Sequence, residues 1–159
     1  MMTDPLHPHS HDPNPEPPSL DASFVLTLAN GRSQTVTVAD LARLPQTAVF
    51  PVYIVSTGHG TSGPFTFHGV TLLDFLRSQM DVDTAPFTVE VISGDGFGNR
   101  VTSYELHHPD SAGPILLAIG LDGRLLTRQQ GAIRMIVPNE KDDALRQVKW
   151  IGKIHVRLV

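Results

Sequence analysis

The last third of the chain, residues 113–159, constrains the fold more than any other stretch. It holds a turn at Asp122-Gly123, an apolar run that ends at Pro138, and a terminal segment of alternating residues. One face of the terminal segment consists of Trp150, Gly152, Ile154, Val156 and Leu158, and the other of Lys153, His155 and Arg157. Because successive side chains of a strand point to opposite faces, this segment predicts a terminal strand with one buried and one partly solvated face.

Short strands and short helices alternate irregularly before this segment. Residues 24–28 and 34–38 flank Asn30-Gly31, whose tolerance of positive φ predicts a hairpin. Further strands are predicted over 49–55, 87–92, 100–106 and 132–137, helical turns over 38–44, 71–80 and 141–147, and either state over 115–119. Without a regular strand–helix repeat, the pattern predicts an α+β domain with mixed, largely antiparallel sheets and short helices.

Composition bounds the domain organisation. With 159 residues, of which 40% are hydrophobic, the chain predicts one globular domain over residues 20–159. Residues 1–19 are rich in His and Pro and almost free of large apolar side chains, which predicts a disordered tail. The alternating histidines of this tail could hold a transition metal, but a solvated tail is the more common case for such a composition.

Several function classes are disfavoured by charge and by residue type. The formal charge of −4, from twelve Lys and Arg against sixteen Asp and Glu, argues against a nucleic-acid partner. There is no cysteine, which excludes disulfides, Cys-ligated metals and cysteine nucleophiles. No signal-peptide pattern and no apolar run of membrane-spanning length is found, so we expect a soluble cytoplasmic protein with no membrane partner.

Two glycine-rich stretches are candidate ligand loops. Residues 56–64 contain three glycines and no large apolar side chain, so their backbone can approach a ligand closely. Ser56 and His59 in this loop raise a hydrolase interpretation, which the missing Gly-x-Ser-x-Gly elbow disfavours. Residues 94–98 (GDGFG) match no nucleotide motif and predict a hairpin turn. The adjacent His107 and His108 point to opposite faces of any strand, so they cannot bind one ion together.

Four cationic side chains are candidates for anion recognition: Arg100, Arg134, Lys149 and Lys153. Arg134 stands out because it interrupts the apolar run 131–137. A buried arginine needs either a carboxylate or a bound anion as its partner. The sequence leaves both alternatives open.

Four motifs resemble the molybdopterin-binding domain of the sulfite oxidase family. They are Phe67 to Leu76, Leu116 to Ile119 with Asp122-Gly123, Gly131 to Arg134 with Pro138, and Val148-Lys149-Trp150-Ile151. The resemblance runs from about Phe24 to Val159 and implies the compact α+β fold of that family. It also implies a groove that holds the pterin phosphate of molybdopterin or of the molybdenum cofactor, with Arg134 and Lys149 at the matching positions.

The chain departs from the family pattern at three polar positions. The resemblance places Ser56 where the family has the cysteine that binds molybdenum, Phe97 where it has an active-site tyrosine, and Gln130 where it has a histidine. A serine hydroxyl is a much poorer metal donor than a thiolate. The implied cofactor-binding residues are Ser56, Gly58, His59, Arg100, Arg134 and Lys149, with Ser56 as the candidate metal ligand.

Three functions therefore remain open. The leading hypothesis is a molybdopterin-binding, oxidoreductase-like domain that lacks the standard molybdenum ligand. The second is an active molybdenum oxidoreductase that uses Ser56 as the metal ligand, with His59 or Arg100 near the substrate. The third is a cofactor-free interaction module on the same fold, favoured if Arg134 pairs with a carboxylate. The expected partner is a pterin cofactor or another small anion.

Overall fold

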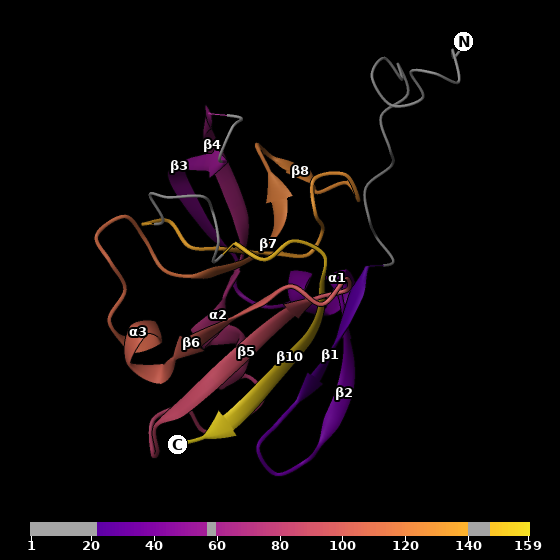
Figure 1. Cartoon of the computed structure of the whole chain (residues 1–159), viewed down its shortest axis with the longest axis vertical. Coiled ribbons are helices and arrows are strands. Elements are labelled where there is room, and N and C mark those ends of the chain that lie inside the picture. The colour runs from indigo at the N-terminus through magenta and orange to yellow at the C-terminus, as the bar shows by residue number, and fades with distance from the viewer. Residues whose placement is uncertain (1–21, 57–59, 140–146) are drawn as a thin grey trace.

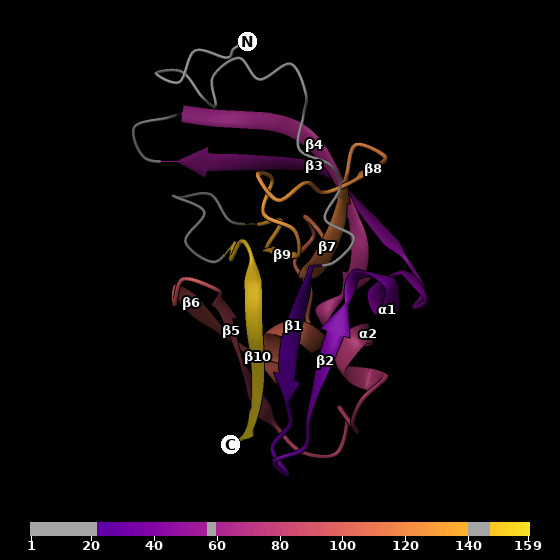
Figure 2. The same ribbon diagram turned by 90° about the vertical axis from the view of Figure 1, so that its right-hand side faces the viewer.

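A computed structural model describes residues 22–56, 60–139 and 147–159. The predictions of a tail over 1–19 and of a helical turn over 141–147 fall outside these residues, except for Gln147. Two sheets form the domain, and the β3–β4 hairpin extends away from the first sheet (Figures 1 and 2). The described residues include no helix that is long and apolar enough to span a membrane.

The first sheet has five strands and contains the chain's last strand near its centre. Its order is β2 (Ser33–Thr37), β1 (Ser23–Thr27), β10 (Ile151–Leu158), β5 (Phe87–Ser93) and β6 (Gly98–Thr102). Strands β1 and β10 are parallel, whereas the other neighbours are antiparallel. The predicted hairpin is confirmed, with Gly31 at a φ of +88° in its turn.

The second sheet is antiparallel and carries the short strand with Arg134. Its order is β3 (Thr47–Ser56), β4 (Gly60–Thr71), β7 (Leu116–Leu121) and β8 (Arg124–Leu125), and β9 (Arg134–Ile136) also pairs with β7. The helices are α1 (Val38–Ala42), α2 (Leu72–Arg77) and α3 (Ser103–His107). Mixed sheets and short helices confirm the predicted α+β class.

Threonine caps determine where the helices begin. The side chains of Thr37, Thr71 and Thr102 each accept a hydrogen bond from the backbone N–H three residues later. Such caps satisfy N–H groups that the first turn of a helix leaves free. The strand predicted over 100–106 is therefore wrong beyond Thr102, because Thr102 and Glu105 form a capping box that starts α3.

Two other sequence predictions need correction. The predicted loop over 56–64 is wrong from Gly60 onward, where β4 begins and pairs back onto β3. The predicted faces of the terminal strand are wrong at its ends, because a register shift between Ile151 and Lys153 interrupts the alternation. Trp150 is 42% exposed, whereas Ile151 is 3% exposed.

Two apolar clusters form the core. The larger one lies between the first sheet and the helices and includes Leu26, Phe75, Met135 and Val148. The smaller one belongs to the second sheet and includes Val52, Phe67 and Ile136. Strand β9 contributes to both clusters, because its successive side chains point to opposite sides. This position places Arg134 between two apolar layers.

Candidate functional site

The candidate site forms where the segment around β9 meets the segment that leads into β10. The backbone N–H of Met135 donates to the Val148 carbonyl over 2.8 Å, and the N–H of Ile151 donates to the Ile133 carbonyl over 2.9 Å. These two bonds require the segments to run in opposite directions. They bring Arg134 and Lys149 to neighbouring positions, although the two residues are fifteen apart in the sequence.

Arg134 is a buried cation whose hydrogen bonding is incomplete. It is 6% exposed, its Nη1 donates to the Gln130 carbonyl over 3.0 Å, and its guanidinium carbon lies 5.3 Å from the centre of the Phe67 ring. Its Nε and Nη2 have no hydrogen-bond partner among the described residues. Burial lowers the pKa of Arg134 to about 10. No carboxylate pairs with Arg134 among residues 22–56, 60–139 and 147–159.

Lys149 adds a second positive charge beside Arg134. Burial and the neighbouring Arg134 charge lower the pKa of Lys149. Gly131 makes room for this lysine, since a Cβ at position 131 would lie 2.8 Å from the Lys149 Cβ. Gly131 also has a φ of +88°, a conformation that other residues rarely adopt. The glycine of the family-like motif therefore allows the two cations to approach each other.

Gln147 is a third polar side chain in the same segment. It is 4% exposed, and neither its amide oxygen nor its amide nitrogen has a hydrogen-bond partner in the part of the chain that the structure describes. Leaving a buried polar group unpaired costs roughly 1–3 kcal/mol. The sequence analysis missed this residue, because only its burial distinguishes it from an ordinary surface glutamine. Its position directly before the Val-Lys-Trp motif was the available signal.

Gln130 has a local structural role. Its Oε1 accepts a hydrogen bond from the Thr127 N–H over 3.0 Å, and its own N–H donates to the Thr127 Oγ1 over 3.1 Å. These reciprocal bonds fix the turn before β9. The Gln130 carbonyl then accepts the bond from Arg134, so the turn also orients the guanidinium.

The structure separates the other predicted site residues from this cluster or leaves them outside the described part. Ser56 ends β3, and its backbone lies opposite Gly60, whereas Gly58 and His59 are outside the described residues. Arg100 belongs to the first sheet and donates from Nη2 to Glu90 over 3.1 Å. Phe97 is 47% exposed in the turn between β5 and β6. Arg134 and Lys149 are thus brought together, and Arg100 is not.

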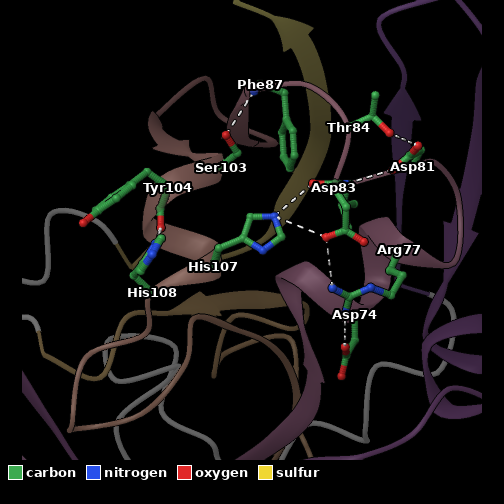
Figure 3. Close-up of polar contacts among 11 residues, drawn as sticks. Asp74, Arg77, Asp81, Asp83, Thr84, Phe87, Ser103, Tyr104, His107 and His108 are labelled. Atoms are coloured by element: carbon green, nitrogen blue, oxygen red, sulfur yellow. Dashed lines mark hydrogen bonds and ion pairs between the residues drawn. The ribbon is translucent and has the colours of Figure 1, made fainter.

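The adjacent histidines belong to a different polar network, shown in Figure 3. His107 Nε2 hydrogen-bonds the Val82 carbonyl over 2.9 Å and lies 3.9 Å from the Asp83 carboxylate. The His108 ring stacks on Tyr104 with 4.1 Å between the ring centres. The His107 contacts join α3 to the segment before β5, whereas the His108 contact lies within α3 and its C-cap. No group of three or more His, Asp or Glu side chains that could hold a metal occurs in the described ranges.

Comparisons with known proteins agree with this geometry. The family model described as "oxidoreductase molybdopterin binding domain" matches residues 14–158. No curated protein matches the chain. The sulfane dehydrogenase SoxCD from Paracoccus pantotrophus has a similar structure, with a TM-score of 0.66 and 18% identity over 88% of this chain. The match spans 39% of that SoxCD chain, and at this identity it shows a shared fold.

The match over residues 14–158 covers nearly the whole chain and includes all four motifs noted in the sequence. The resemblance to the sulfite oxidase family is thereby confirmed. The chain belongs to the oxidoreductase molybdopterin-binding domain family.

Proposed function

We propose that this domain binds molybdopterin through Arg134, Gln147 and Lys149, and that it does so without the thiolate that would hold catalytic molybdenum. The observation that carries the proposal is the Arg134 guanidinium, which is buried and has two nitrogens that pair with nothing in residues 22–56, 60–139 and 147–159. A buried arginine without a carboxylate is costly until an anion neutralises it.

The polar groups present fit a phosphate-bearing pterin. A phosphate takes N–H donors, and charge-assisted hydrogen bonds from guanidinium groups are among the strongest in proteins. Arg134 offers two unused N–H-bearing nitrogens, and the adjacent Lys149 ammonium adds charge. The Gln147 amide has both a donor and an acceptor unused, which suits a heterocycle edge that also presents both.

The residues fit the metal of the cofactor less well than they fit the pterin. Metal-bound molybdopterin supplies two-electron redox chemistry when a protein holds it. The chain has no cysteine in its 159 residues, and a neutral serine hydroxyl binds a metal more weakly than a thiolate. We therefore assign to this domain the holding of the pterin, and no catalytic step.

The test measures pterin and molybdenum in protein purified from molybdenum-replete cells. Pterin is quantified by fluorescence after oxidation, and molybdenum by inorganic mass spectrometry. We expect pterin in the wild type and in the control Arg124→Gln, a change at an exposed strand residue of the second sheet. The Arg134→Met variant should contain no pterin. The molybdenum content should be far below one atom per chain.

The possible failures identify which part is wrong. Absence of pterin from the wild type would reject the binding proposal. Stoichiometric molybdenum would reject the non-catalytic assignment, and its loss in Ser56→Ala would then support Ser56 as the metal ligand.

A further inference from the structure

Cationic side chains gather on the outer face of the first sheet. In the register of this sheet His155 lies opposite Glu90, and Glu90 lies opposite Arg100. Lys153 and Arg157 share the face of His155, because residues two apart in a strand point to the same side. Helices α1 and α2 lie on the other side of the sheet (Figure 2), so this face is open.

A single carboxylate organises the face. Glu90 accepts 3.1 Å hydrogen bonds from Arg100 Nη2 and from Arg157 Nε. His155 Nδ1 lies 3.8 Å from the same carboxylate. The bonds from the two arginines lower the pKa of Glu90, so the carboxylate stays ionised at neutral pH. Glu90 therefore orders two guanidinium groups before any partner binds. This reduces the side-chain entropy that would be lost on binding.

The face has the opposite charge to the rest of the chain. Its strand positions hold three Lys and Arg (Arg100, Lys153, Arg157) and one acid, Glu90, which leaves nine Lys and Arg against fifteen Asp and Glu elsewhere. Arg157 is 58% exposed in its side chain although it is bonded to Glu90. A shallow groove lined by Glu90, Ile92, Gly98 and Arg100 crosses the same face. A local positive field on a negative molecule attracts and orients acidic partners.

We infer that this face, defined by Arg100, Lys153, His155 and Arg157, is a docking surface for an acidic segment of a partner protein. A nucleic-acid backbone fits less well, because non-specific affinity for nucleic acid comes mainly from phosphates neutralised by Lys and Arg, and this face presents three such residues. A lipid surface also fits less well, because membrane-bound faces combine cations with large apolar side chains. Val25 is the exposed large apolar side chain on these strands' outer face, at 42% exposure.

The experiment uses fluorescently labelled poly-L-glutamate as the probe and the full chain as the receptor. Fluorescence anisotropy gives the Kd at about 50 and 150 mM salt. Between these concentrations the Debye screening length falls from roughly 14 to 8 Å. The test variant is the double change Lys153→Gln with Arg157→Gln. The matched control is Arg124→Gln, which removes an exposed strand cation from the other sheet. Circular dichroism checks that each variant is folded.

We expect the double variant to weaken binding about tenfold or more at the lower salt, from the loss of two charges in the patch. The control should bind like the wild type, and higher salt should weaken the wild type. Absence of binding, or equal binding by the double variant, would overturn the inference. Tighter binding of a twenty-residue oligothymidine or of anionic phospholipid vesicles, with the same residue dependence, would also overturn it in favour of that other class of partner.

Discussion

Two regions of this domain contain arginines that differ in exposure and in whether a carboxylate compensates their charge. On the outer face of the first sheet, Arg100 and Arg157 are exposed and share Glu90. In the second sheet, Arg134 is 6% exposed and has two nitrogens for which the described residues offer no partner. Exposed ion pairs contribute about 0–1 kcal/mol each, whereas a buried charge without its counterion costs several kcal/mol.

In the first region, the chain's own carboxylate compensates the arginine charge. In the second, a bound ligand would have to compensate it. Glu90 already compensates part of the outer charge. In the described part of the chain, Arg134 faces a second cation, Lys149, whose pKa its charge lowers after burial. A folded state that keeps this arrangement gains most from binding an anion, and for this reason we propose it as the site of a phosphate-bearing pterin.

The largest expected effect comes from Arg134→Met. The ligand-free variant should be at least as stable as the wild type, because an apolar side chain replaces an uncompensated buried charge. Inorganic phosphate at about a hundred times its Kd should raise the free energy of unfolding of the wild type by about 2.7 kcal/mol and leave the variant unchanged. Urea denaturation with and without phosphate measures both quantities. A marked loss of stability in the ligand-free variant would show that Arg134 is a structural residue.

Gly131→Ala should have the next largest effect, with Gly123→Ala as its matched control. Both glycines have positive φ, +88° and +86°, so each substitution costs about 1–2 kcal/mol of backbone strain. A Cβ at position 131 would also press on Lys149, whereas at position 123 nothing lies within 4 Å. We expect Gly131→Ala to lose more unfolding free energy than Gly123→Ala. We also expect only Gly131→Ala to bind phosphate more weakly than the wild type. Equal losses in the two variants would mean that Lys149 is not held by this contact.

Glu90→Gln tests the outer face of the first sheet. We expect this change to lower the free energy of unfolding by about 1 kcal/mol at neutral pH. The two arginines hold the folded-state pKa of Glu90 below its ordinary value of 4.5. Its stabilisation is therefore fully present above about pH 4.5 and is lost as the pH falls through the lower folded-state pKa. Denaturation across pH 3 to 7 should show the wild type and variant converging at the acid end. A difference that stays constant with pH would contradict this assignment.

The smallest effect concerns the pKa of Lys149 in Arg134→Met. Burial and the Arg134 charge both lower this pKa in the wild type, so removing the arginine should raise it partway toward the ordinary lysine value. A carbon-13 NMR titration of the lysine Cε resonances measures the change, with Lys149→Gln used to assign the signal. An unchanged pKa would mean that the two cations do not interact.

The parts of the fold that local chemistry determines could be predicted from the sequence. Asn30-Gly31 predicted its hairpin, because the turn needs positive φ. The helical turn predicted over 71–80 contains α2, whose start is set locally because the Thr71 side chain accepts a hydrogen bond from the Asp74 N–H. Arg134 and Lys149 were selected as a pair through the family resemblance rather than through local chemistry, and the structure brings them together.

The features that the sequence analysis missed depend on contacts between distant segments. The start of β4 has Gly, Ser and Thr rather than alternating apolar residues, and pairing with β3 makes it a strand. The register shift in β10 moves Trp150 out of the core. Gln147 became a candidate through its burial, and the only local signal for it was its position directly before the Val-Lys-Trp motif.

The most direct test of the central claim follows the side-chain Nε–H resonances of Arg134 and Arg157 by NMR while inorganic phosphate is added at about 150 mM salt. Arg134→Lys and Arg157→Lys assign the two signals. We predict that the Arg134 Nε–H, which has no partner in the ligand-free protein, shifts downfield and exchanges more slowly, and that the Arg157 signal stays in place. A shift of Arg157 with no change at Arg134 would contradict the assignment of the anion site to the buried arginine.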